Sequence, residues 1–158
     1  RYPRGPGLGL SIKKPIRKLT IGKGRIIQEG NDIAFLSYGA KLEEVKFAVK
    51  KLNEFKLSCT IADARFCKPL DTKLLLELCN NHKLLVTIEE GAIGGFGSHV
   101  VNFLVNGNKK FYEKILIENI MLPDRFIDQD TPFNMYNNAK MNSADIVNRI
   151  LVKLGELK

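Results

Sequence analysis

Short apolar runs rich in β-branched residues alternate with longer amphipathic stretches through most of this 158-residue chain. The short runs are typical of strands and cover residues 24–29, 33–38, 57–62, 84–88 and 115–120. The longer stretches have helical spacing and cover residues 41–55, 71–81, a segment that ends near Val105, and a last one that Ser143 caps. Strands that alternate with helices of this length form βαβ units. The sequence therefore predicts an α/β fold with three layers (α/β/α) and a five-stranded, mostly parallel sheet.

The N-terminal part of the chain predicts a hairpin and, before it, a linker. Gly30-Asn31-Asp32 separates the first two strand runs and has turn chemistry, so we expect those runs to form a hairpin with an antiparallel first strand. Residues 1–20 are rich in proline and glycine and lack periodicity, which is typical of a linker. The chain also starts without an initiator methionine, so we expect it to be part of a longer protein. Residues 21–158 are predicted to form one domain.

Charge and cysteine content restrict the partners that we expect. The formal net charge is +8, but the lysines are scattered and no aromatic residues interleave with them, so we expect no nucleic-acid partner. No apolar run approaches the roughly 18 residues of a membrane span, so we expect no membrane partner. Cys59, Cys67 and Cys79 are odd in number and show no metal-ligand spacing, which predicts reduced core thiols.

Three further features are candidate sites of chemistry. Residues 94–98 (GGFGS) lie between a buried strand and a helix, where free backbone N–H groups could receive an anion; a tight turn is the more favoured interpretation. Glu89 and Glu90 end a buried strand at the edge where open α/β sheets place ligands, but helix capping or a domain contact is favoured over catalysis. His82, near Cys79, is interpreted as a histidine at the solvent edge rather than a catalytic base.

Seven phrases in order along the chain resemble one enzyme family. They are RYPRG (1–5), IGKG (21–24), LSYG (36–39), DARFCKPLD (63–71), VTIEEG (86–91), GGFGS (94–98) and LPDRFI (122–127). This series resembles the C-terminal part of the 1-deoxy-D-xylulose-5-phosphate synthase family, within the transketolase superfamily. Phrases such as the Glu-Glu-Gly turn recur across the superfamily, whereas ARFxKPLD and LPDRFI together point to the synthase family more narrowly. One departure is the loop after Gly91, which is one residue shorter than in many relatives; another is the asparagine-rich segment 130–141, whose conformation stays open.

The resemblance implies a homodimeric transferase that uses thiamine diphosphate and Mg²⁺. Such an enzyme condenses pyruvate with glyceraldehyde 3-phosphate and releases CO₂, opening the methylerythritol phosphate route to isoprenoids, thiamine and pyridoxal. The chain would be its third domain, with residues 1–20 as the linker and end of the preceding pyrimidine-binding domain. By the same resemblance, Arg4 binds the phosphate of glyceraldehyde 3-phosphate. No catalytic, cofactor-binding or metal-binding residue is assigned, because the family places its cofactor site in the earlier domains and this chain has no Gly-Asp-Gly motif.

Three alternatives stay open at this point. The chain could be a non-catalytic interaction or assembly domain of the same fold, or part of another thiamine-dependent enzyme such as the β part of a 2-oxoacid dehydrogenase. A nucleic-acid binder is the most distant of them. The expected compartment is the plastid if the source is a plastid-bearing eukaryote, and the cytoplasm otherwise. The fragment by itself is expected to be inactive.

Overall fold

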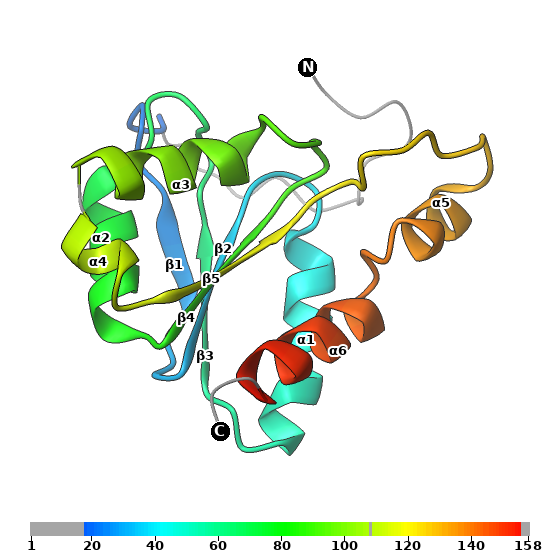
Figure 1. Cartoon of the computed structure of the whole chain (residues 1–158), viewed down its shortest axis with the longest axis horizontal. Helices are drawn as coiled ribbons and strands as arrows, with labels where there is room; N and C mark the ends of the chain where they lie inside the picture. The colour runs from blue at the N-terminus through cyan, green and yellow to red at the C-terminus, as the bar shows by residue number, and fades with distance from the viewer. Residues whose placement is uncertain (1–17, 108, 156–158) are drawn as a thin grey trace.

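Five strands in the order β1-β3-β2-β4-β5 form the centre of the computed structural model, which describes residues 18–107 and 109–155 (Figure 1). Their bounds are Arg25–Gln28 (β1), Ile33–Ser37 (β2), Cys59–Asp63 (β3), Leu84–Ile88 (β4) and Leu116–Ile120 (β5). β2, β3, β4 and β5 are parallel, and β1 pairs antiparallel with β3. The predicted class, a mostly parallel five-stranded sheet with an antiparallel first strand, is confirmed.

The predicted hairpin between the first two strands is wrong. β3 lies between β1 and β2, so that Ile61 pairs with Phe35 on one side and with Gln28 on the other. All five residues of β2 are buried, and such a strand needs partners along both of its edges. Parallel pairing with β3 fills one of those edges, and β1 is displaced to the outside of the sheet. The turn at Gly30 consequently lies against β3, where its N–H donates to Thr60 Oγ1 over 2.9 Å.

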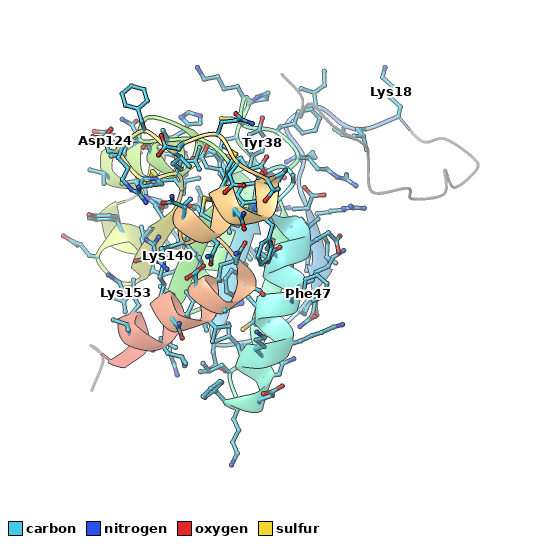
Figure 2. The ribbon with its side chains drawn as sticks, turned by 90° about the vertical axis from the view of Figure 1, so that its right-hand side faces the viewer. Lys18, Tyr38, Phe47, Asp124, Lys140 and Lys153 are labelled. Atoms are coloured by element: carbon cyan, nitrogen blue, oxygen red, sulfur yellow. The ribbon has the colours of Figure 1, made fainter. Side chains whose placement is uncertain are left out.

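Helices cover both faces of the sheet, as the three-layer prediction requires. Their bounds are Leu42–Glu54 (α1), Thr72–Asn81 (α2), Phe96–Gly107 (α3), Lys109–Tyr112 (α4), Pro132–Asn138 (α5) and Ser143–Gly155 (α6). Ile33 and Phe35 of β2 face the core under α1 and α6, which lie side by side in Figure 2, whereas Ala34 and Leu36 face the core under α2 and α3. Alternate residues of one strand thus supply both cores.

Two C-terminal elements refine the predictions from sequence. The asparagine-rich segment forms α5, where the Thr131 side chain accepts a hydrogen bond from Asn134 N and Pro132 occupies the first turn. Ser143 was predicted to be the N-cap of the last helix, but α6 begins at Ser143, so this residue belongs to the first turn. Instead, the carbonyl of Asn142 accepts the first helical hydrogen bond, and Ser143 N donates to Glu44 Oε2 of α1 over 2.8 Å. No helix in the described ranges 18–107 and 109–155 is long and apolar enough to cross a membrane.

Asp71 caps α2, as the sequence predicts, and also joins α2 to the segment before β1. Its side chain accepts hydrogen bonds from Leu74 N, from Gly24 N and from Lys23 Nζ. Burial by itself would raise the pKa of Asp71, but these three hydrogen bonds outweigh burial and hold the pKa below its ordinary value. The ionised carboxylate therefore stabilises the folded chain.

Replacing Asp71 with alanine should lower the free energy of unfolding by about 2 kcal/mol near neutral pH, the upper part of the range for an N-cap. Because the folded pKa lies below the unfolded value of about 3.9, the contribution is complete above that pH and is lost as pH falls through the folded value. Urea unfolding of both chains between pH 7 and pH 3 should show the difference shrinking with acidification. Asp128→Ala, at an exposed position, is the control and should change stability little; a difference for Asp71→Ala that stayed constant to pH 3 would contradict the assignment.

Arg149 of α6 covers part of the outer edge of β5. Leu116 N and Ile120 O bond toward β4, so residues 117 and 119, which alternate with them, direct their backbone groups away from the sheet. Arg149 Nη2 donates to the Asn119 carbonyl over 3.2 Å, and the same guanidinium forms an ion pair with Glu118. One of the free acceptors of this edge strand is thereby occupied from within the chain.

Candidate functional site

The carboxyl ends of the four parallel strands gather polar side chains at one edge of the sheet. Ser37 ends β2, Asp63 ends β3, and Glu89 and Glu90 follow β4 directly. Ligands of open α/β sheets bind at this edge.

Glu89 occupies the N-terminal end of α3. Its side chain is 5% exposed, and Oε1 accepts a hydrogen bond of 2.8 Å from Gly97 N. Gly91 and Gly95 lie so close that a Cβ on either would fall 2.3 Å or 2.4 Å from Glu89 Oε2. The glycine-rich segment after β4 thus forms a close-fitting cradle around a carboxylate of the same chain. A helix N-terminus attracts negative charge, and here Glu89 supplies that charge.

This arrangement decides between the two interpretations of residues 94–98. The backbone N–H of Gly97, which could have received an external anion, is already bound to Glu89. Gly94 adopts a positive φ of 94° and its N–H donates to Ser98 Oγ, which forms the tight turn. The structural interpretation is confirmed, and Glu89 has the helix-capping role that the sequence analysis favoured.

Glu89→Ala should lower the free energy of unfolding by about 2 kcal/mol, because it leaves a buried N–H group of α3 without a charged acceptor. Glu89→Gln keeps the shape and one oxygen acceptor, so the loss should be smaller. Urea denaturation of the two variants measures both values. Glu54→Ala, at the exposed end of α1, removes the same charge without a capping contact and should have little effect. Equal losses for Glu89→Ala and Glu54→Ala would rule out the capping role.

Glu90 belongs to a second cluster, on the α1 side of the same edge. Tyr136 of α5 donates its hydroxyl to Glu90 Oε1, and Lys41 Nζ lies 2.9 Å from the centroid of the Tyr136 ring. Lys41 immediately precedes α1 and is only 3% exposed. The cluster therefore joins the start of α1, the end of β4 and α5.

The charges of this cluster compensate one another. Burial lowers the pKa of Lys41, while Glu90 and Glu44 act in the opposite direction. Burial also raises the pKa of Tyr136, as does its hydrogen bond to Glu90, so the phenol keeps its proton. Ser37 Oγ lies buried nearby on β2 and has no hydrogen-bond partner among the described residues. The contacts of Tyr136 with Glu90 and Lys41 hold α5 on the sheet.

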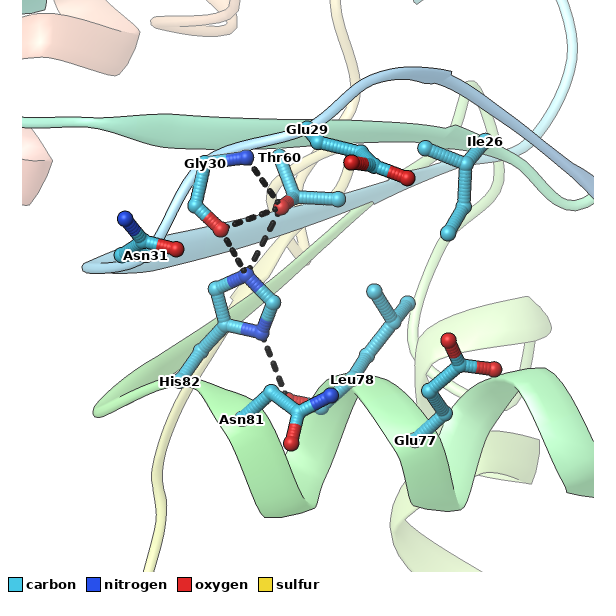
Figure 3. Close-up of a pocket in the computed structure, with 9 residues that line it drawn as sticks. All are labelled: Ile26, Glu29, Gly30, Asn31, Thr60, Glu77, Leu78, Asn81 and His82. Atoms are coloured by element: carbon cyan, nitrogen blue, oxygen red, sulfur yellow. Dashed lines mark hydrogen bonds between the residues drawn. The ribbon is translucent and has the colours of Figure 1, made fainter.

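His82 lies at the opposite edge of the sheet and its environment differs from the prediction (Figure 3). The sequence analysis placed it at the solvent edge, but the ring is half-buried and joins three segments. Its Nδ1 donates to the Leu78 carbonyl over 2.9 Å, and Nε2 lies 2.7 Å from Thr60 Oγ1 and 3.0 Å from the Gly30 carbonyl. The ring borders a groove of about 460 Å³ between α2 and the β1–β2 turn. The sequence missed these contacts because two of the partners lie 22 and 52 residues away.

The cysteines behave as core thiols. All three are free; Cys59 and Cys79 are buried, and Cys67 is half-buried. Burial raises the pKa of Cys59 and of Cys79 to about 12, so neither is a thiolate near neutral pH. Cys79 and His82 consequently do not form an activated nucleophile and base.

Thiamine diphosphate with Mg²⁺ would need acidic metal ligands and free backbone N–H groups for its diphosphate. Within residues 18–107 and 109–155 no group of three or more His, Cys, Asp or Glu side chains could hold a metal ion. The glycine-rich helix N-terminus that could hold a diphosphate contains Glu89 instead. The described residues therefore do not fit this cofactor. Arg4, assigned to substrate phosphate by resemblance, lies outside the described residues and keeps the status of a prediction.

Comparisons with known proteins agree with this fold. The family model of the transketolase C-terminal domain matches residues 22–146. Among solved structures, one described as a split-gene transketolase in an inactive β4 tetramer has a similar fold, with a TM-score of 0.79 and 24% sequence identity. The superposition covers 92% of this chain and 46% of that chain, so this chain spans about half the length of that one.

Proposed function

Because this chain belongs to the transketolase C-terminal domain family, we propose that it is the C-terminal domain of a thiamine-diphosphate-dependent transferase. We further propose that the whole protein is a 1-deoxy-D-xylulose-5-phosphate synthase, which condenses pyruvate with glyceraldehyde 3-phosphate and releases CO₂. The family match over residues 22–146 carries the first proposal. The second is supported by the phrases DARFCKPLD and LPDRFI, at residues 63–71 and 122–127.

The domain is proposed to support the reaction by packing against other parts of the protein. Two acidic side chains at the carboxyl edge, Glu89 and Glu90, are bound within the chain. Large apolar side chains near the same edge face outward: Ile93 is 70% exposed, Phe126 101% and Phe133 71%. Apolar side chains of this size on a surface mark protein contacts. They support a packing role toward the preceding domain or the second subunit of a homodimer.

The cofactor is proposed to bind outside this chain. Thiamine diphosphate supplies the carbanion chemistry of such enzymes, with Mg²⁺ holding its diphosphate. Since the described residues do not fit the cofactor, no step of the reaction is assigned to them. Arg4 is the one residue proposed to contact substrate, by binding the phosphate of the aldehyde through its guanidinium.

The full-length protein tests the proposal directly. With thiamine diphosphate and Mg²⁺ present, pyruvate should release CO₂ in proportion to added glyceraldehyde 3-phosphate, with a five-carbon ketose phosphate as product. The isolated 158-residue chain should release none. Ketol transfer from a sugar phosphate without CO₂ release would indicate a transketolase instead, and acyl transfer to a lipoyl acceptor would indicate a 2-oxoacid dehydrogenase. Absence of thiamine-dependent turnover in the full-length protein would favour a non-catalytic assembly domain.

A further inference from the structure

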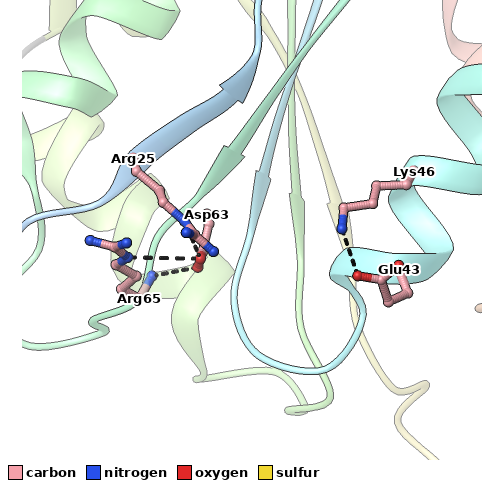
Figure 4. A network of polar contacts seen from close by, with 5 residues as sticks. All are labelled: Arg25, Glu43, Lys46, Asp63 and Arg65. Atoms are coloured by element: carbon pink, nitrogen blue, oxygen red, sulfur yellow. Dashed lines mark hydrogen bonds and ion pairs between the residues drawn. The ribbon is translucent and has the colours of Figure 1, made fainter. Parts of the chain in front are cut away.

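Two arginines at the carboxyl end of β3 share one carboxylate. Arg25 Nε, at the start of β1, donates to Asp63 Oδ2 over 3.1 Å, and Arg65 Nε lies 3.9 Å from the same oxygen (Figure 4). Asp63 is well placed to orient both, because its side chain is only 17% exposed and its other oxygen accepts from Arg65 N over 3.1 Å. One acidic side chain thus holds two guanidinium groups at the edge of the sheet.

Most N–H donors of these two guanidinium groups have no acceptor among the described residues. The terminal nitrogens of Arg25 and Arg65 donate no hydrogen bond to any residue in the ranges 18–107 and 109–155. The Arg65 side chain is nevertheless only 25% exposed, so its guanidinium has lost much of its contact with water. Two positive charges face one negative charge, and the cluster keeps an excess of one positive charge.

The backbone at Arg65 forms a tight turn directly after β3, in which Arg65 N donates to Asp63 Oδ1 and Phe66 N donates to the Ala64 carbonyl over 2.6 Å. The φ of Arg65 is +57°, in the left-handed region that side chains other than glycine and asparagine avoid. Lys56 and Lys140 also have positive φ, but they follow the C-terminal ends of α1 and α5, where this conformation is common. Arg65 follows a strand, and the left-handed turn brings its side chain beside Arg25. Strain of this kind accumulates at functional sites.

We propose that Arg25 and Arg65 form a binding site for a phosphate monoester at the carboxyl edge of the sheet, with Asp63 as the positioning residue. A guanidinium presents a planar fork of donors that matches phosphate oxygens, and two forks can engage different oxygens of one phosphate. A phosphate carries more acceptor oxygens and more charge than a carboxylate, which suits the two sets of free donors and the excess positive charge. This proposal is independent of the proposed function, because it uses neither Arg4 nor the cofactor.

Thermal unfolding of the full-length protein tests this site, with glycerol phosphate raised through the millimolar range at constant ionic strength. A ligand that binds only the folded state raises the unfolding midpoint according to its dissociation constant. Arg25→Gln and Arg65→Asn should each raise the dissociation constant for glycerol phosphate about three- to tenfold, as expected on loss of a partly exposed charged contact. Asparagine is chosen at position 65 because it tolerates the left-handed conformation. Lys51→Gln, at an exposed position on α1, removes the same charge and should leave the response unchanged.

Two further arms distinguish fork geometry from charge alone. Arg25→Lys keeps the positive charge but lacks the planar set of guanidinium donors. Its stabilisation by glycerol phosphate should therefore lie between those of Arg25→Gln and the unmodified protein. Acetate at the same ionic strength should stabilise the protein less than glycerol phosphate does. A phosphate response that is absent in the unmodified protein, or equal in Arg25→Gln, Arg65→Asn and Lys51→Gln, would overturn the proposal. Any other phosphate site of the protein would persist in these variants, so only the part of the response that they remove is attributed to Arg25 and Arg65.

Discussion

Gly30→Ala should lower the free energy of unfolding by about 3 kcal/mol, the largest stability loss expected from a glycine-to-alanine change within residues 18–107 and 109–155. A Cβ at Gly30 would lie 2.4 Å from the Cys59 carbonyl carbon and 2.5 Å from the Cys59 nitrogen. These are backbone atoms at the start of β3, so no side chain can rotate away to make room. The displaced turn would also lose its contacts with Thr60 and His82.

Gly107→Ala is the matched control for this experiment. Gly107 ends α3, and nothing lies within 4 Å of the position where its Cβ would stand. Alanine is favoured over glycine in a helix by up to about 1 kcal/mol, so this variant should be neutral or slightly more stable. Urea unfolding with an unchanged slope measures both effects. Similar stabilities for the Gly30 and Gly107 variants would show that the turn does not need close approach to β3.

Arg4→Ala in the full-length protein should reduce kcat/KM for glyceraldehyde 3-phosphate about ten- to a hundredfold, as expected on loss of a charged hydrogen-bond pair of about 1.5–3 kcal/mol. The release of CO₂ from pyruvate in the absence of aldehyde should change little, because the guanidinium is proposed to contact only the aldehyde phosphate. Steady-state kinetics with each substrate varied separately distinguishes the two effects.

Arg1→Ala provides a control in the same phrase, since it removes an identical charge three residues earlier. Its kinetic constants should match those of the unmodified protein. An aldehyde without a phosphate group should be used equally well by the Arg4 variant and the unmodified protein. If Arg4→Ala left kcat/KM for glyceraldehyde 3-phosphate unchanged, Arg4 would have no role in phosphate binding.

Local signals in the sequence predicted the elements of this fold well. The apolar stripe of residues 41–55 corresponds to α1, and Asp71 caps α2 as its position before an apolar stretch indicates. The pairing of β1 was not predicted, because its partner residues lie 36 and 38 positions away in the sequence: Arg25 lies opposite Asp63, and Ile26 opposite Ala62. The residue types at positions 30–32 indicate only a turn, and the pairing of β2 with β3 on one edge and β4 on the other prevents the hairpin.

The candidate sites were predictable to different degrees for the same reason. Glu89 and its glycines lie within eight residues of one another, so a capping role could be proposed from sequence. Lys41, Glu90 and Tyr136 meet only in the folded chain, and neither the lysine nor the tyrosine has a local pattern that marks it. Arg25 and Arg65 are likewise brought together by the antiparallel pairing of β1 with β3, which the hairpin prediction excluded.

The hydrogen bond from Arg149 to the Asn119 carbonyl affects how β5 can pair with other molecules. An outermost strand with free N–H and C=O groups is a template on which a strand of another molecule can add, and β5 is such a strand. By engaging one of these acceptors and placing a charged group beside it, Arg149 interrupts the row of groups that an incoming strand would need. These contacts make β5 a poorer template for an incoming strand.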